Sequence, residues 1–276
     1  GGYVFSGLNP PLVLTGALKN SASKRFAETF SYGVDTWTVG GMTRFGVGFK
    51  SAIRIRMIHA LVRRNLQRKS EWDFEKWGLP ISQTDMLSSY LGPATFSLGA
   101  RVQGVPVTKR EENAVIHHAA FAGWLLGVKE EWLVHDMRGV QKMMVHSLAT
   151  QPLGDDNSKV MARSLVAEPM SREFKHFQQL QRKWHYHKHL SVSSFYLPKT
   201  VIKDLGIDTT IAWVPMVTIP ARFVWHVAHR LFPGGKKRLA KKGFEKQKSQ
   251  SEIFAKYSKS ATAIVDTDTG HPAHIA

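Results

Sequence analysis

Cysteine is absent from the 276-residue chain, and this absence excludes several classes of protein. The chain can have neither a disulfide framework nor a metal centre with thiolate ligands. It also lacks a Gly-rich phosphate loop, a catalytic-serine elbow and an HExxH zinc motif. No stretch alternates as a strand would and no internal repeat appears, whereas apolar residues recur at helical spacing. The sequence therefore predicts an all-α protein.

Acidic residues are scarce, with 21 Asp and Glu against 38 Lys and Arg, and the formal net charge is +17. Such a charge suits an anionic surface, either nucleic acid or acidic lipid. The densest run of basic residues is the cluster 234–242, so we divide the chain into a folded domain, 1–232, and a basic tail, 233–276, predicted to be disordered. Because the first residue is not methionine, we also expect an upstream segment, which can include a targeting sequence.

Residues 209–231 are the most apolar stretch, but its uncharged part is too short for a bilayer span of ~20 residues. We predict a packed core helix. An interfacial role stays open, because a basic cluster beside an amphipathic helix can bind anionic lipid at about 1 kcal/mol per basic side chain. A nuclear-localisation or nucleic-acid patch and a solvated tail are the alternatives. An intracellular, membrane-associated location is favoured, and secretion is left open.

One predicted helix, residues 52–68, carries the strongest candidate site. Arg56, His59 and Arg63 follow at spacings of three and four, so a helix places them on one face among aliphatic residues. Buried arginines need anionic partners. A haem whose iron binds His59 would supply such anions as its propionates. The alternative is a partly buried histidine with arginines that reach to water.

Four segments in this order resemble the latex clearing protein (rubber oxygenase) family, which includes a fungal membrane-bound oxygenase acting on a farnesyl side chain. The resemblance covers about residues 20 to 150. Its segments are Arg25 with Thr29, the Arg56-x-x-His59-x-x-x-Arg63 helix, Trp77-Gly78-Leu79-Pro80-Ile81 with Asp85, and Trp124 with Gly127-Val128.

This resemblance implies a globin-like helical core enclosing a b-type haem, with dioxygen as co-substrate. It further implies His59 as the iron ligand, Arg56 and Arg63 as partners of the haem periphery, and Arg25 and Thr29 on the distal side. The reaction implied is oxidative cleavage of a carbon–carbon double bond. Its substrate would be an isoprenoid or another hydrophobic unsaturated compound, small or polymeric.

Two positions depart from the family. Where the family has a lysine before the distal threonine this chain has Glu28, and the spacing of the family's catalytic glutamate falls on Asn9. We therefore predict that Glu28 serves as the general base, kept ionised by Arg25 one turn away. The family's later arginine has two candidates, Arg163 and Arg182.

The remaining histidines compete for the metal role. We expect His117 and His118 to be core or pocket-lining residues rather than ligands. His185, His187 and His189 alternate, but no carboxylate accompanies them, so a zinc-type site there is not favoured.

Two rival functions follow from these departures and from the charge. One is a non-catalytic helical protein that carries haem or lipid on an anionic membrane. The other, a nucleic-acid binder, would need its basic residues on the folded domain rather than the tail, so no nucleic-acid partner is expected.

Overall fold

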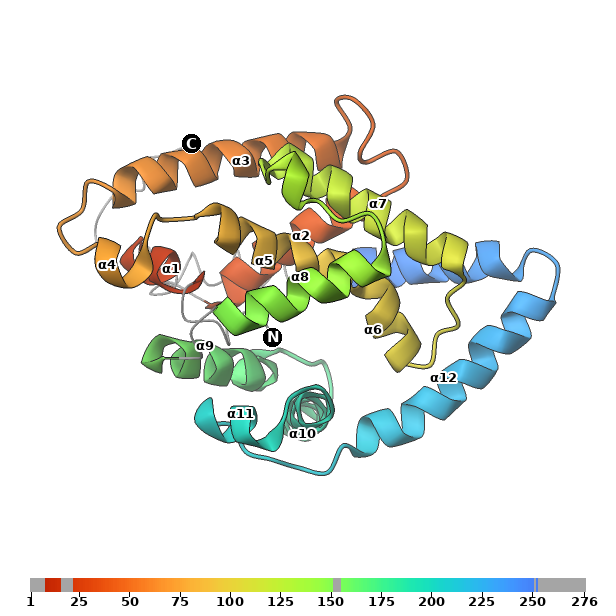
Figure 1. Cartoon of the computed structure of the whole chain (residues 1–276). Helices are drawn as coiled ribbons and strands as arrows, with labels where there is room; N and C mark the ends of the chain where they lie inside the picture. The colour runs from red at the N-terminus through yellow and green to blue at the C-terminus, as the bar shows by residue number, and fades with distance from the viewer. Residues whose placement is uncertain (1–7, 16–21, 151–154, 251, 253–276) are drawn as a thin grey trace.

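The protein is all-α in the part of the chain that the computed structural model describes, residues 8–15, 22–150, 155–250 and 252. This confirms the all-α part of the predicted fold class. The α-helices are α1 (Pro10–Leu14), α2 (Ala22–Trp37), α3 (Val47–Leu66), α4 (Phe74–Trp77), α5 (Gln83–Ala94), α6 (Phe96–Val102), α7 (Lys109–Leu126), α8 (Met137–Thr150), α9 (Asp156–Ala167), α10 (Gln178–Tyr196), α11 (Lys199–Asp204) and α12 (Trp213–Leu231) (Figure 1). Short 3₁₀ turns, η3 (Glu130–Trp132) and η4 (Glu168–Ser171), precede α8 and follow α9.

The hydrophobic core lies where α5, α7 and α8 meet. Local signals fix the ends of these helices. The Thr108-x-x-Glu111 pattern predicts a capping box and Gly127 a helix stop; the structure shows both, at the start of α7 and, in the left-handed conformation, at its end. Ser82 and Asp85 form a second capping box at the start of α5. The apolar faces of the three helices then bury Met86, Leu87, Tyr90, Leu91, Ala94, Ile116, Ala119, Ala120, Val128, Val134, Met137 and Val140.

Helices α2 and α3 form a tight helical hairpin that covers one side of this core. Gly33, Gly40 and Gly41 in the sequence predict a loop over 33–47, but α2 continues to Trp37 and the loop spans 38–46. A Cβ atom at Gly48 would lie 2.7 Å from the carbonyl oxygen of Asp35, so only glycine permits this approach of the two helices. Ser51 adds a 2.7 Å hydrogen bond from its hydroxyl to the Asp35 carboxylate.

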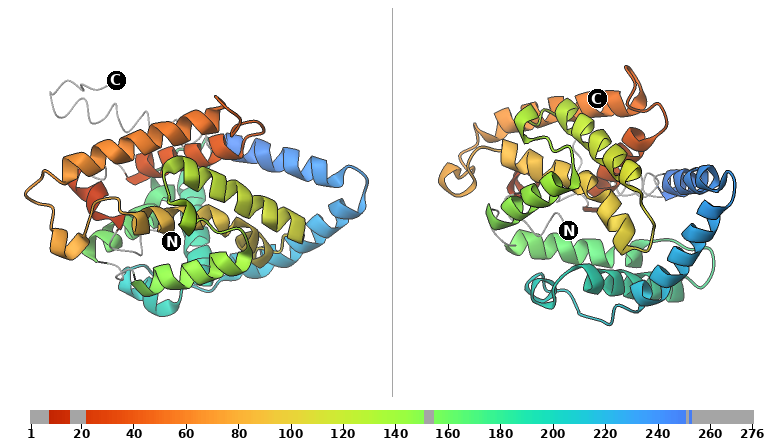
Figure 2. Two further views of the ribbon diagram at one scale, coloured as in Figure 1. Left: turned by 45° about the horizontal axis from the view of Figure 1, so that its top comes forward. Right: turned by 45° about the vertical axis from the view of Figure 1, so that its right-hand side comes forward.

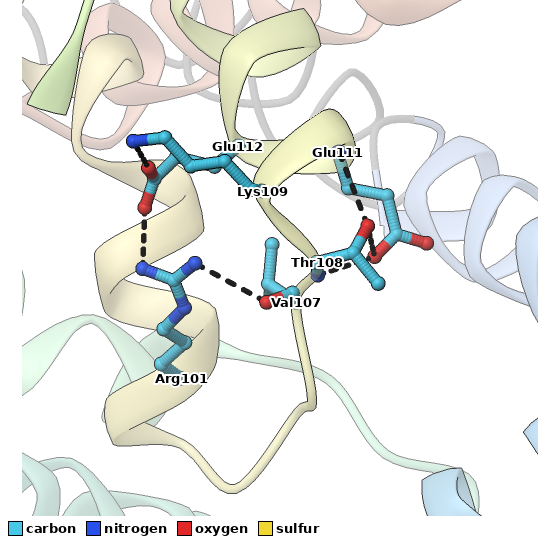
Figure 3. A network of polar contacts seen from close by, with 6 residues as sticks. All are labelled: Arg101, Val107, Thr108, Lys109, Glu111 and Glu112. Atoms are coloured by element: carbon cyan, nitrogen blue, oxygen red, sulfur yellow. Dashed lines mark hydrogen bonds and ion pairs between the residues drawn. The ribbon is translucent and has the colours of Figure 1, made fainter.

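A buried carboxylate joins α6 to α7 (Figure 3). Glu112 is 2% exposed and binds both Lys109, at 2.6 Å, and Arg101. The hydrogen bond from Lys109 is the main cause that lowers the pKa of Glu112, and Arg101 lowers it further. Arg101 also donates to the carbonyl of Val107 at 3.2 Å. These bonds fix the corner between two helices that line the cavity described below.

Fewer of the described residues are buried in the second half of the chain. Of the residues of α12, Val214 and Pro215 are buried, so the prediction of a packed core helix over 209–231 is wrong for most of its length. The physical reason is that one side of α12 rests on α10 and no further layer of described residues covers the other (Figure 2). In the described ranges, no helix has both the length and the apolarity to cross a bilayer.

Residues 235–250 form a last helix, which turns back from α12 (Figures 1 and 2). The prediction of a disordered tail from residue 233 is therefore wrong for 235–250. Ala240 and Phe244 lie opposite Trp37 and Phe96 across a small cavity of about 390 Å³, and this apolar side orders the helix against the domain. Residues 253–276 lie outside the described ranges, and the domain boundary at 232 stays a prediction.

Candidate functional site

A cavity of about 1250 Å³ lies between α2, α3, α5, α6 and α7. Pockets for small molecules usually measure about 300–1,000 Å³, so this one has room for a large ligand or for two ligands. Most of its exposed wall area is apolar, and polar side chains enter it from the five helices or from the residues at their ends, among them Glu28, Arg54, Ser89, Gln103 and His118.

His59 reaches this cavity from α3, together with Ile55 and Ile58 of the same helix face. Its side chain is partly buried. Glu28 and Thr29 line the same cavity from α2, at exposed positions. The structure thus brings three of the predicted site residues to one cavity. Arg25 lies on α2, but its side chain is outside the part of the structure that is described.

Arg56 and Arg63 lie beside His59 on α3 but do not line the cavity. Arg63 donates from Nε to the carbonyl of Pro80 at 3.1 Å and from Nη2 to that of Ile81 at 2.6 Å. Arg56 is exposed and donates to the carbonyl of Leu125 at 3.4 Å, in the last turn of α7. Arg56 is exposed and Arg63 is half-buried, so the expectation that both are buried is wrong. Main-chain carbonyls accept their hydrogen bonds, and Arg56 is favourably placed at the negative end of a helix dipole. Their contact with the haem periphery stays a prediction.

Gln83 connects the two segments that these arginines bind. Its side-chain amide donates to the carbonyl of Gly127 at 3.0 Å and accepts from the backbone N–H of Lys129 at 3.0 Å. Consequently the Trp77–Asp85 and Trp124–Val128 segments meet beside α3, and the Arg56/Arg63 side of the helix is fixed to both. Three of the four sequence segments therefore form one structural unit, which sets where His59 enters the cavity.

Two further cavity residues were not singled out from the sequence. Tyr32 lies one turn after Thr29 on α2, a spacing that could have revealed it, and Arg54 enters from α3. Burial raises the pKa of Tyr32 to about 12, so its hydroxyl stays protonated at neutral pH. Among the described residues, the buried Tyr32 hydroxyl has no hydrogen-bond partner.

His118 also lines the cavity, which confirms for this residue the prediction of a core or pocket-lining position; for His117, which is exposed and does not line the cavity, the prediction is wrong. Its ring lies 4.0 Å from that of Trp37, centroid to centroid. Burial, and secondarily the neighbouring His117, lowers the pKa of His118, so the imidazole is neutral at physiological pH. Within the described ranges its buried Nε2 atom has no hydrogen-bond partner. Together with Tyr32, it leaves hydrogen-bonding capacity for a ligand in the cavity.

The remaining candidates lie elsewhere. Asn9 is buried and donates to the hydroxyl of Ser158 at 2.7 Å, away from the cavity. Arg163 and Arg182 donate to the carbonyls of Gly206 and Arg172, at 3.0 and 2.7 Å. Neither lines the cavity.

The histidines of α10 lie in the second half of the chain. His185 and His189 are a partly buried pair whose pKa values are lowered, chiefly by burial. Among the described residues, no three His, Asp or Glu side chains gather as a metal site.

Comparison with known proteins places this arrangement in a family. A rubber oxygenase from Streptomyces sp. (strain K30) is 30% identical over 151 residues, which are 52% of this chain and 37% of that protein. The chain thus spans little more than a third of the length of this relative. No solved structure matches the chain. The family profile described as "ER-bound oxygenase mpaB/B'/Rubber oxygenase, catalytic domain" matches residues 3–230, so the chain belongs to the family of these oxygenase catalytic domains.

Proposed function

We propose that the protein is a haem b-dependent oxygenase whose iron ligand is His59. The observation that carries this proposal is the cavity of about 1250 Å³ that His59 shares with Glu28 and Thr29 of the facing helix. Membership of an oxygenase family supports it. The globin-like arrangement remains part of this proposal.

The residues of the cavity fit a haem. Haem iron needs a single imidazole from the protein, which His59 can supply without the three-ligand cluster of other metal sites. Arg54 is the cationic side chain at the wall and would pair with a propionate. The hydroxyl of Tyr32 and Nε2 of His118 offer hydrogen bonds that no described residue takes up. When bound, haem would supply the iron chemistry that activates dioxygen.

The chain's own residues would select and orient the substrate. Apolar walls favour a hydrophobic unsaturated molecule, such as an isoprenoid. Glu28 lies on the exposed side of the cavity, where a carboxylate stays well solvated, and would accept the proton lost from the carbon next to the cleaved double bond. Thr29, beside it, would hold the substrate or dioxygen by its hydroxyl.

A spectrum and an oxygen electrode test this function. The purified, haem-reconstituted protein should show a Soret band and should consume oxygen with squalene, whose double bonds are isolated, but not with squalane, the saturated hydrocarbon of the same skeleton. His59→Ala should lose the Soret band while the helical circular dichroism remains. His117→Ala, an exposed histidine of α7, is the matched control and should retain haem. Haem retention in His59→Ala would refute the ligand assignment.

A second function, haem or lipid binding without turnover, is favoured by one observation. Asn9, at the spacing of the family's catalytic glutamate, is an amide buried against Ser158 and does not reach the cavity. A protein that binds haem and shows no squalene-dependent oxygen uptake would support this alternative against the oxygenase.

A further inference from the structure

The outward side of α12 is an apolar stripe. Val217, Val224 and Leu231 are seven residues apart, so they lie on one side of the helix, and they are 67%, 66% and 78% exposed. Met216 and Phe223 flank them at 67% and 52% exposure. An apolar stripe of this length on a helix surface normally packs against something.

The opposite side of α12 is fixed to the domain. Arg222 donates to the carbonyl of Gln103 at 3.0 Å, and Arg230 binds Glu111 at 3.1 Å. Because these contacts hold the inner side in place, the helix cannot rotate to bury its stripe. Gln103 lines the large cavity, so α12 also lies alongside the cavity wall.

The helix 235–250 adds positive charge to α12. A Cβ atom at Gly235 would lie 1.6 Å from the carbonyl oxygen of His229, so the turn between the two helices requires glycine. Lys242 lies over the ring of Trp225, 5.3 Å from its centroid, which joins the two helices. Within 235–250 the acidic residue is Glu245, and the exposed basic residues are Lys236, Lys237, Arg238, Lys241, Lys242, Lys246 and Lys248.

We infer that the stripe of α12 and the basic helix 235–250 together bind the surface of an anionic lipid bilayer. An amphipathic helix beside basic side chains lies in the headgroup region with its apolar residues ~5–10 Å deep, and the charges are attracted to acidic lipids. Nucleic acid would account for the charges but not for the exposed stripe. This inference does not depend on the proposed oxygenase function.

The test is sedimentation of the full chain with vesicles. Vesicles of equimolar phosphatidylcholine and phosphatidylserine should bind the protein, pure phosphatidylcholine vesicles should bind it at least about tenfold more weakly, and salt should weaken the anionic binding. Val224→Glu should reduce binding by about tenfold or more, since a charge enters the apolar stripe. Val145→Glu is the matched control, because Val145 is 64% exposed on α8, and it should bind as the parent does.

A second pair of variants tests the charges. The double variant Lys237→Glu, Lys241→Glu should abolish the preference for anionic vesicles. Lys50→Glu, Lys142→Glu, with the same change in net charge at exposed positions of α3 and α8, should retain it. Circular dichroism confirms that each variant is folded.

Three results would overturn the inference. Equal binding of Val224→Glu and Val145→Glu would show that the stripe takes no part. Self-association that Val224→Glu disrupts, without vesicle binding, would make a second copy of the chain the partner. Tight binding of random-sequence duplex DNA, with no vesicle binding, would identify a nucleic-acid surface instead.

Discussion

Helices α3 and α12 resemble one another in sequence but differ in what covers them. They have 20 and 19 residues, and each combines aliphatic side chains with histidine and arginine. On α3 one side faces the large cavity and the arginines beside it bind a loop and the end of α7, whereas α12 binds the domain on one side and exposes the other. The comparison shows that the role of a helix that carries histidine and arginine depends on which elements pack against it. Four predictions test this contrast.

The largest expected effect compares the same substitution at the ends of the two helices. Leu66 of α3 is 0% exposed and Leu231 of α12 is 78% exposed. Leu66→Ala should lower the free energy of unfolding by about 2–5 kcal/mol, because it creates a cavity in packed surroundings. Leu231→Ala should change it by no more than about 0.5 kcal/mol. Urea unfolding measures both, and equal losses would mean that α12 is packed as tightly as α3.

Glu28 lies on α2, the helix that faces α3, and a variant of this residue tests its proposed role as a base. Glu28→Gln should preserve the haem spectrum and lower squalene-dependent turnover by ~10²-fold, the usual contribution of a positioned base. Glu75→Gln, at an exposed carboxylate of α4, is the control and should leave turnover unchanged. An unchanged rate in Glu28→Gln would return Glu28 to an ordinary surface position.

A variant of Arg63 distinguishes a structural role of this residue from direct contact with haem. Arg63→Ala removes the donor from two carbonyls and should cost about 1–3 kcal/mol of stability. Arg64→Ala, the exposed neighbour, should cost little. Haem titration and thermal unfolding should show that Arg63→Ala loses haem affinity together with stability. Loss of haem affinity at full stability would support the prediction that Arg63 contacts the haem periphery.

The smallest effect concerns acid stability. Burial lowers the pKa of His118 from its ordinary value of 6.5, so the unfolded chain takes up a proton before the folded one does. Stability from this residue is complete above pH 6.5 and is lost as the pH falls below it toward the folded-state pKa. His118→Phe retains an aromatic ring beside Trp37 and should reduce the loss of stability between about pH 7.5 and about pH 5.5. An unchanged pH dependence would contradict the buried, neutral imidazole.

Local chemistry made part of this structure predictable. The capping box of Thr108 and Glu111 and the stop at Gly127 fixed α7 from sequence alone, and helical spacing indicated the all-α class. The partners of Arg63 were not predictable, because they are main-chain carbonyls, which every residue has. The exposure of α12 was missed for a related reason: an apolar run gives no sign of whether another layer will cover it. Tyr32 and Arg54 could not be identified as cavity residues without knowing which helix faces form the cavity wall.

The spacing of Arg56, His59 and Arg63 can serve as a pattern for searching other genomes. The hydrogen bonds of the two arginines show which structural feature such a search would find. Because Arg63 binds loop carbonyls at residues 80 and 81 and Arg56 binds a carbonyl in the last turn of α7, the spacing identifies a way of joining one helix to a loop and to the end of another helix. A sequence that keeps both arginines and has another residue in place of the histidine would be expected to keep this architecture without the imidazole. The two arginines are thus a signature of this architecture, and the proposed haem ligation concerns His59 alone.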